Sequence, residues 1–379
     1  MRFMPFSLQS TRLIVVTAMG LLLCACSSVR YYAQAAHGQG SLIVHRRTLD
    51  KVIGDSSTTP KLAARLQLAQ QARRFATQQL GLPDNRSYTS YVALDRPYVA
   101  WNVFAAPRYS IEAVPQCFPV AGCVAYRGWF SEADAKADAA RLQAAGDDVW
   151  IGGVPAYSTL GWFADPILSS MLRWDDDELV GTIFHELAHQ LVYAKGDTAF
   201  NESFASFVQN EGLRQWHQSR GDPAPDEHAQ AMADEFTRLV LQLREQLKSL
   251  YASGSDDASM ERGKQRDIAA FRTRYAYWRD CAGFEAHRYD AWVEQPINNA
   301  RLLPFGLYDQ WEPAFAALFR RDERNWSAFY ASVRQLAKED KAARGGRLNT
   351  LLQDVEPGIP AHSVTDCGAS DSSSTGTLH

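Results

Sequence analysis

Two histidines and two glutamates stand close together in the stretch HELAHQLVYAKGDTAFNE, residues 185–202. His185 and His189 are four residues apart, so on a helix both imidazoles project from one face and can bind one metal ion. Neutral imidazole suits zinc, and a rigid helix fixes the angle between the two ligands. Glu186 would stand beside the metal, where it can take a proton from water that the zinc activates.

A third ligand is expected from Glu202, which lies 13 residues after His189 in the phrase FNESFA. Gly196 would turn the chain, and a returning helix would bring the carboxylate back to the histidines. The alternative is a glutamate that only interacts with the helix dipole. Glu211 is a rival ligand, about two and a half turns further along. Two histidines, one glutamate and a water form an open, catalytic zinc site, whereas structural zinc sites are closed and rich in cysteine.

Several elements must position these side chains. The apolar spacing predicts a helix over about 177–194, with acidic residues at its start, and a second helix over about 199–217. Strands are predicted before them and helices mostly after them, which predicts an α+β fold: a small sheet beside the histidine helix, then a mainly helical part. The predicted strands are 97–105, 123–130, 148–154 and an extended edge at 155–163; the other predicted helices are 60–80, 131–142, 225–252, 258–279 and 311–340.

The N-terminus has the features of an exported protein. An apolar run of 11 residues, LIVVTAMGLLL, is shorter than the about 20 residues of a membrane span and ends in LCAC. This places Cys26 like the lipidated cysteine of a bacterial lipoprotein, with residues 1–25 as signal peptide. A plain signal peptide cut near Ala25, or an uncleaved anchor, is the alternative. Serines after Cys26 would suit the periplasmic side of the outer membrane.

The rest of the chain is expected to form one catalytic domain over 60–355, after a tether over 26–59 and before a flexible tail over 356–379. The hydrophobic content of 46% fits a globular protein. The net charge of -4, without a dense basic cluster, gives no indication of a nucleic-acid partner. The expected partners are a peptide or protein substrate, and the membrane through the lipid on Cys26.

Four cysteines remain beyond Cys24 and Cys26, an even number in an oxidising compartment. They allow three connectivities. We favour Cys117–Cys123, because CFPVAGC is short and rich in turn residues, together with Cys281–Cys367. Free buried thiols are the alternative.

The sequence resembles the predicted zinc-dependent aminopeptidases that occur as proteobacterial lipoproteins, within the gluzincin group. The resemblance covers roughly 30–340. It implies a gluzincin-like fold and a peptidase that uses one zinc ion per chain, with Glu186 as general base. It is carried by the phrases RSYTSYVALDRPYVAWNVFAAP, CFPVAGCVAYRGWF, AYSTLGWFADP, FHELAHQ, GDTAFNESFASFV and NNARL.

The resemblance also implies residues around the metal. Gluzincins stabilise the oxyanion with a tyrosine or histidine from a later segment, for which Tyr308 is the candidate, with Asn299 and Arg301 shaping the same wall. Tyr308 as an ordinary core tyrosine is the alternative. In gluzincins an edge strand before the zinc helix pairs with the substrate backbone. Here that strand would bring Tyr157, Ser158, Thr159, Leu160 and Gly161 to the substrate, unless it is an ordinary sheet strand.

Other functions remain open at this stage. An envelope-protein chaperone or assembly factor would use the cleft mainly for binding. A peptidoglycan amidase or peptidase is less favoured, because no wall-binding repeat is visible. Cleavage inside peptides and removal of single N-terminal residues are not separated. No GxMEN string, which recognises the free amine in well-studied gluzincin aminopeptidases, is present.

Overall fold

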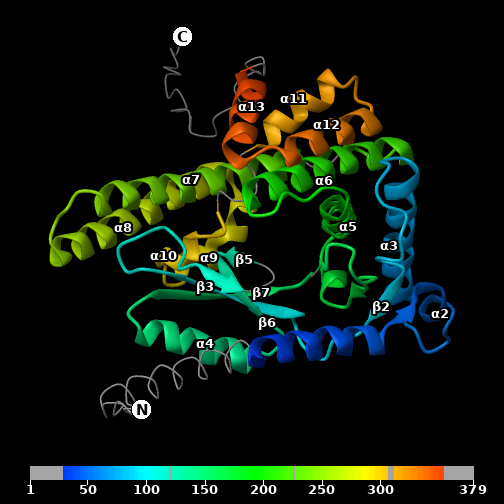
Figure 1. Ribbon diagram of the computed structural model, residues 1–379, viewed down its shortest axis with the longest axis horizontal. Helices are drawn as coiled ribbons and strands as arrows, with labels where there is room; N and C mark the ends of the chain where they lie inside the picture. The colour runs from blue at the N-terminus through cyan, green and yellow to red at the C-terminus, as the bar shows by residue number, and fades with distance from the viewer. Residues whose placement is uncertain (1–28, 119–121, 157, 225–226, 306–310, 354–379) are drawn as a thin grey trace, which may run out of the picture.

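The computed structural model describes residues 29–118, 122–156, 158–224, 227–305 and 311–353. The α+β class is confirmed: small sheets lie in the N-terminal half, and helices make up the C-terminal half (Figure 1). The strands are β1 (Arg47–Thr48), β2 (Ser90–Val92), β3 (Ala100–Ala106), β4 (Gln116–Phe118), β5 (Gly122–Val124), β6 (Tyr126–Trp129), β7 (Asp148–Val154) and β8 (Ile167–Leu168). They form three sheets in the orders β1-β2-β8, β6-β3-β7 and β4-β5.

The sheet nearest the predicted metal site is β6-β3-β7, in which β3 runs antiparallel to both neighbours. β7 begins and ends where the sequence predicts, and it pairs with β3 along its full length. Alternate residues of β3, such as Trp101 and Val103, pack against α4 (Glu132–Ala144) in a small core. This helix begins as predicted, because the Ser131 hydroxyl accepts a hydrogen bond from the backbone N–H of Asp134.

The segment expected to be a tether and lead-in, residues 26–59, contains helices and a strand from residue 29 on. Residues 29–45 form a helix beside the β6 edge of this sheet (Figure 1). The Gln34 side chain accepts a hydrogen bond from the backbone N–H of Phe130, and Tyr31 packs edge-on against Trp129. Leu42 is buried in the main core. Residues 46–59 continue into β1 and α2 (Leu49–Ile53).

The two helices that carry the predicted ligands are α5 (Asp176–Leu191) and α6 (Thr198–Arg220), and they pack against each other. Each is started by an aspartate: Asp175 accepts from the backbone N–H of Glu178, and Asp197 accepts from that of Phe200. Helix α3 (Pro60–Gln78), also predicted, covers α5. The main hydrophobic core lies among these helices.

Two further groups of helices complete the fold. Helices α7 (Glu227–Tyr251) and α8 (Asp257–Ala282) form a hairpin with its own core. The short helices that follow, η2 (Phe284–Tyr289), α9 (Asp290–Glu294) and α10 (Asn299–Leu302), contribute side chains to that core. Helices α11 (Glu312–Arg321), α12 (Trp326–Lys338) and α13 (Lys341–Gln353) follow, and α11 packs on α6. The single helix predicted over 311–340 is therefore two, interrupted where Glu323 and Arg324 have φ of 56° and 55°.

The predicted signal peptide, Cys26 and the predicted tail lie outside the described residues. Within the described part of the chain, no helix combines the length and the apolar character that crossing a bilayer requires.

Candidate metal centre

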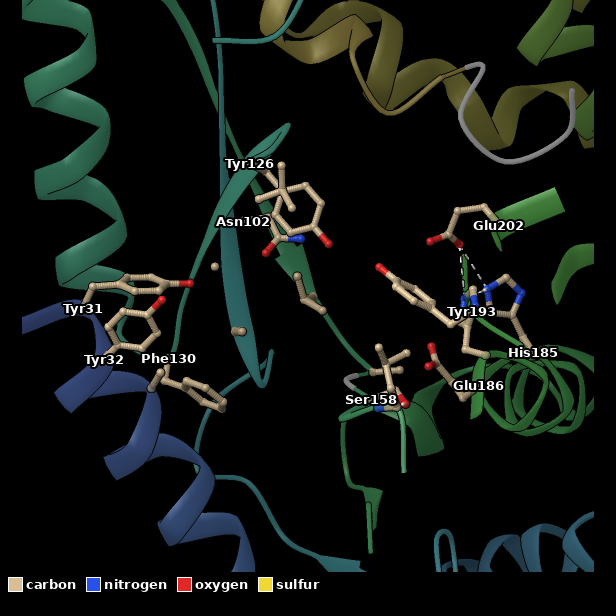
Figure 2. A pocket seen from close by; sticks show the side chains of 18 residues that line it. Tyr31, Tyr32, Asn102, Tyr126, Phe130, Ser158, His185, Glu186, Tyr193 and Glu202 are labelled. Atoms are coloured by element: carbon tan, nitrogen blue, oxygen red, sulfur yellow. Dashed lines mark hydrogen bonds and ion pairs between the residues drawn. The ribbon is translucent and has the colours of Figure 1, made fainter. Parts of the chain in front are cut away.

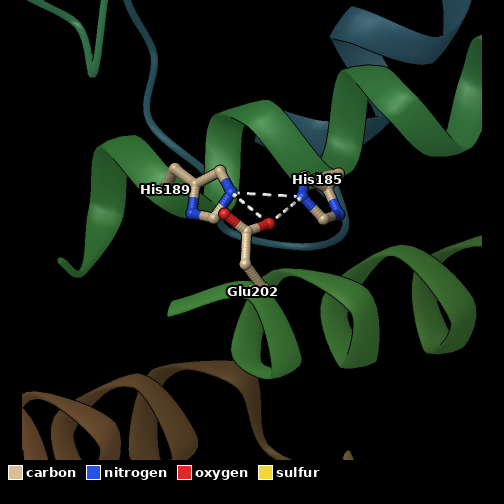
Figure 3. Close-up of side chains that lie close together, drawn as sticks. All are labelled: His185, His189 and Glu202. Atoms are coloured by element: carbon tan, nitrogen blue, oxygen red, sulfur yellow. Dashed lines mark hydrogen bonds and ion pairs between the residues drawn. The ribbon is translucent and has the colours of Figure 1, made fainter. Parts of the chain in front are cut away.

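Helices α5 and α6 bring three predicted ligands to one point (Figure 3). Nε2 of His185 and Nε2 of His189 are 3.1 Å apart, since the residues are one turn apart on α5. Oε2 of Glu202, from the second turn of α6, lies 3.3 Å from the first nitrogen and 3.5 Å from the second. In the described part of the chain, these residues are the group of histidine, cysteine and acidic side chains that could hold a metal ion.

These distances fit a tetrahedral zinc site. With zinc–ligand bonds of about 2.0–2.1 Å, two ligands of a tetrahedron lie about 3.3–3.4 Å apart. The three measured separations, 3.1, 3.3 and 3.5 Å, scatter around that value. Two imidazoles and one carboxylate are also the donor set that an open zinc site uses. The residues present therefore fit the metal that the sequence predicts.

A turn that precedes Glu202 holds its helix in place. The Asn201 side-chain oxygen accepts a hydrogen bond from the backbone N–H of Ala194 at 2.7 Å, and its amide nitrogen donates to the Ala194 carbonyl at 2.9 Å. Asn201 is 1% exposed. This double hydrogen bond fixes the start of α6 against the end of α5, and with it the ligand beside Asn201. Asn201 is a residue of the site that the ligand spacing alone does not reveal.

The electrostatics of the site favour a cation. Burial would raise the pKa of Glu202, but hydrogen bonds and charge interactions with His185 and His189 hold it at about 2. Burial lowers the pKa of His189, yet the carboxylate of Glu202 outweighs this effect and raises it. Without metal, the cluster thus holds a negative carboxylate and attracts a proton. Within the described residues, buried Nδ1 of His189 has no hydrogen-bond partner.

Glu186 lies next to the ligands without being one of them. It lines the same cavity as the two histidines and Glu202, and Figure 2 shows its carboxylate beside His185, pointing into the cavity. Neighbouring residues on a helix are rotated by about 100°, which explains why Glu186 points past the metal position. This is the placement that a general base requires.

The cavity beside the metal position has a volume of about 590 Å³, within the range of about 300–1,000 Å³ for small-molecule sites. It is bounded by the helix at 29–45, the sheet β6-β3-β7, the segment after β7, and helices α5 and α6. Its described lining residues are Tyr31, Tyr32, Ala35, Ala100, Asn102, Val124, Tyr126, Gly128, Phe130, Val154, Ala156, Ser158, Leu160, His185, Glu186, His189, Tyr193 and Glu202.

Two tyrosines that sequence analysis missed face the metal end of this cavity. Figure 2 shows the hydroxyl groups of Tyr126, from β6, and Tyr193, just after α5, turned toward the space beside Glu202. Tyr126 is 38% exposed toward the cavity, but the surrounding protein desolvates its hydroxyl and raises its pKa to about 12, with a further contribution from the charge of Glu202. Tyr126 therefore stays protonated at neutral pH and can donate a hydrogen bond. Tyr193 lies four residues after His189, and this spacing could have indicated that it lies near the metal ligands.

The predicted edge strand at 155–163 is wrong for its described residues, because 155–156 and 158–163 form a loop with turns. Leu160 has a φ of 54° and Gly161 a φ of 80°, which an extended strand does not allow. Buried Asp165 imposes these turns, because its carboxylate accepts hydrogen bonds from the backbone N–H and the hydroxyl of Thr159, at 2.9 and 2.8 Å.

Of the residues proposed to pair with the substrate backbone, some line the cavity and others do not. Ser158 and Leu160 line the cavity. The Thr159 side chain is turned to Asp165, and Gly161 lies beside Gln190 of α5. Tyr157 lies outside the described residues.

The candidates from the later segment are placed elsewhere. Asn299 is fully buried and donates to the backbone carbonyls of Pro107 and Arg108. Arg301 is 3% exposed, and its guanidinium lies 4.4 Å from the ring centroid of Trp292. Neither lines the cavity, so the expected wall from these two residues is not found; they hold α10 against β3 and the α8–α9 region. Tyr308 lies outside the described residues.

The structure joins Cys117 and Cys123 of the β4–β5 hairpin by a disulfide bond. Cys281 at the end of α8 is also disulfide-bonded. Cys367 and Cys26 lie outside the described residues.

Comparison with family models gives one match, to the family described as "Putative aminopeptidase", over residues 30–348. The chain belongs to this family. The match includes the helix at 29–45, the metal cluster and the cavity. Comparison with curated proteins and with solved structures gives no match. Family membership thus indicates peptidase chemistry at a coarse level.

Proposed function

We propose that this member of the family is a zinc-dependent peptidase of the gluzincin type, with the aminopeptidase activity that the family's description suggests. The observation that carries the proposal is the spacing of the three ligand atoms, all within 4.8 Å of one another, with Glu186 beside them in the same cavity. We further propose that the protein is lipid-anchored through Cys26 on the periplasmic side of the outer membrane. The motif at the N-terminus supports this location.

In the proposed reaction, His185, His189 and Glu202 would hold the zinc ion. A zinc ion bound there would supply a Lewis acid that polarises the scissile carbonyl and lowers the pKa of water. Glu186 takes the proton from the attacking water and passes it to the leaving nitrogen. The water oxygen joins the carbonyl carbon, the C–N bond breaks, and the products are a carboxylic acid and an amine.

The hydroxyls of Tyr126 and Tyr193 are candidates to stabilise the oxyanion that develops on the carbonyl. Both line the cavity, and Figure 2 shows both turned toward the space beside Glu202. A protonated phenol donates a hydrogen bond to a developing negative charge without needing to reorganise. Tyr308, which lies outside the described residues, stays a candidate for the same role from the resemblance to gluzincins.

The test compares the purified protein with a Glu186→Gln variant on a mixed peptide set, half with free and half with acetylated N-termini. The products are read by mass spectrometry. We expect loss of single N-terminal residues from the free peptides only. Glu186→Gln should lower turnover by about 10²- to 10⁴-fold, because it removes the general base.

Two controls make the result specific. Glu186→Gln should still contain one zinc ion per chain by elemental analysis. Glu178→Gln, an exposed position on the same helix outside the cavity, should keep parental turnover. Internal cuts in both peptide sets would show an endopeptidase instead, and zinc binding without any cleavage would move the interpretation to a binding protein of the chaperone type.

A further inference from the structure

The two ends of the cavity differ in chemistry. The charged groups among its described lining residues, Glu186 and Glu202, both lie at the metal end, and none of those lining residues is a lysine or arginine. The opposite side is aromatic: Figure 2 shows Tyr31, Tyr32 and Phe130 gathered across the cavity from His185 and Glu186. We call the group Tyr31, Tyr32 and Phe130 the aromatic wall.

The aromatic wall is held rigidly by contacts behind it. The ring of Tyr31 meets the ring of Trp129 at 90° with 5.5 Å between centroids, and it meets Tyr32 at 71° and 5.7 Å. Both are edge-to-face arrangements, which aromatic pairs favour. The Arg127 guanidinium lies 5.4 Å from the Tyr31 ring centroid, but Arg127 is not among the described residues that line the cavity.

The Phe130 ring lies close to the helix at 29–45 because a glycine of that helix faces it. A Cβ atom added at Gly38 would meet the Phe130 ring at 2.2 Å, so the ring occupies space that only a glycine leaves open. The helix is fixed here because Gln34 accepts a hydrogen bond from the backbone N–H of Phe130 at 3.0 Å. The wall is therefore a preformed surface rather than a set of loose side chains.

Such a surface selects side chains by polarity and size. Burying an apolar side chain against it is favourable by roughly 1.5–3 kcal/mol, which corresponds to about 10- to 100-fold in affinity. A carboxylate would lose its hydration there without meeting an opposite charge, and an ammonium would be compensated only by the ring faces. A small side chain such as that of alanine would leave the wall uncovered.

We propose that the aromatic wall is a side-chain subsite, and that the protein prefers peptides with a large uncharged residue, aromatic or branched aliphatic, near the scissile bond. Tyr32 and Phe130 are the specificity-determining residues. The inference rests on the proposed peptidase function, because it takes the substrate to be a peptide. It adds the helix at 29–45, which the sequence placed in a tether, to the substrate site.

The test measures binding separately from cleavage. Full-length protein carrying Glu186→Gln and loaded with zinc is titrated by calorimetry with alanine tetrapeptide amides, in which one position at a time is Phe, Leu, Asp or Lys. At one position we expect the Phe and Leu peptides to bind about 10- to 100-fold more tightly than the all-alanine peptide. The Asp and Lys peptides should bind no better than alanine.

Variants in the same background assign the preference to the wall. Tyr32→Ala and Phe130→Ala should each reduce the gain from Phe by about 5-fold or more, while Tyr32→Phe should keep it. Tyr277→Ala, at a tyrosine that is 58% exposed and outside the cavity, is the matched control and should change nothing. Zinc content and circular dichroism check that each variant is folded.

Equal affinity for the Phe and alanine peptides at every position, including no binding of either, would overturn the subsite. So would a gain that survives both Tyr32→Ala and Phe130→Ala. Cleavage by the parent protein is read separately: cleavage without preference would retain the proposed function and overturn the subsite. Selective binding without cleavage would do the reverse.

Discussion

Glu202 illustrates how opposing effects on one side chain prepare a metal site. Burial alone would favour its neutral form, yet its pKa is lowered to about 2 by the two histidines that face it. The carboxylate is therefore charged throughout the neutral range, with two nitrogen lone pairs beside it. Removing it would leave two neutral ligands and no charge to offset that of the cation.

Replacing Glu202 by alanine should consequently lower zinc affinity by more than about 100-fold, beyond the about 10- to 100-fold typical of losing an outer partner. Competition with a chelator measures this. Glu211→Ala is the matched control, because Glu211 lies on the same helix but its carboxylate accepts hydrogen bonds from Arg214 and Gln215. Equal zinc affinity in Glu202→Ala and the parent would show that the third ligand is wrong.

The pH dependence of zinc binding follows from the same pair. Burial lowers the pKa of His189 but Glu202 raises it more, so in the metal-free protein this histidine holds its proton to a higher pH than an ordinary histidine. Zinc needs the neutral imidazole, and the proton therefore competes with it. Zinc affinity should rise as pH increases through this raised pKa and level off above it.

A chelator competition repeated between about pH 5.5 and 8.5 would record this rise. In Glu202→Ala the midpoint should move to lower pH, since the carboxylate that raises the pKa is gone. A flat profile in the parent would contradict the coupling between the two side chains.

At the scale of elements, the helix at 29–45 offers a paired comparison. Gly38 and Gly40 both lie in it, and alanine at either position should improve helix propensity by up to about 1 kcal/mol. At Gly40 a new Cβ meets nothing within 4 Å, whereas at Gly38 it meets the Phe130 ring at 2.2 Å. Overpacking of this kind costs about 1–3 kcal/mol.

Gly40→Ala should therefore keep or raise the melting temperature, and Gly38→Ala should lower it relative to Gly40→Ala. Thermal unfolding followed by circular dichroism compares the two. Identical melting temperatures would mean that the helix is not seated against Phe130 as the structure shows.

This helix also shows where sequence reasoning reached its limit. Helices α5 and α6 were predictable because aspartates at their starts and Gly196, with a φ of 80°, mark the ends locally. The helix at 29–45 has a weak apolar pattern and two glycines. Its stabilisation comes from distant partners such as Trp129 and Phe130, which no local pattern reveals.

The same reason explains the errors in the candidate site. The ligands and Glu186 follow from spacing on one helix and one turn, which sequence reports directly. The loop at 155–163 contains aromatic residues and a threonine that suit a strand, but hydrogen bonds to Asp165 impose turns on its described part. Asn299 was a candidate through the resemblance to gluzincins, and only the packing of α10 shows that it is buried.

At the scale of the whole molecule, helix α13 stabilises the start of α6, the helix that carries Glu202. The Arg344 guanidinium of α13 pairs with Asp197 at 2.8 Å, and both residues are buried. Asp197 is the residue that starts α6. Removing one partner from a buried ion pair costs about 3–5 kcal/mol, because the other charge is left uncompensated.

Arg344→Met should therefore lower the free energy of unfolding by about 3–5 kcal/mol and weaken zinc binding through the start of α6. Urea denaturation and zinc titration measure the two effects. Arg347→Met on the same helix is the control, since the Arg347 side chain is 70% exposed and its pair with Glu339 should contribute less than about 1 kcal/mol. Similar losses in both variants would remove the special role of Arg344.

The early start of the folded chain has a consequence for where the protein can work. Two residues, Ser27 and Ser28, separate the proposed lipid attachment at Cys26 from Val29, and these three Cα-to-Cα steps reach at most about 10–11 Å. Tyr31 and Tyr32 of the cavity lining follow within one helical turn. A protein anchored in this way would have almost no flexible linker. It would stay in a thin layer next to the bilayer and meet its peptides by lateral diffusion, rather than sampling the depth of the periplasm.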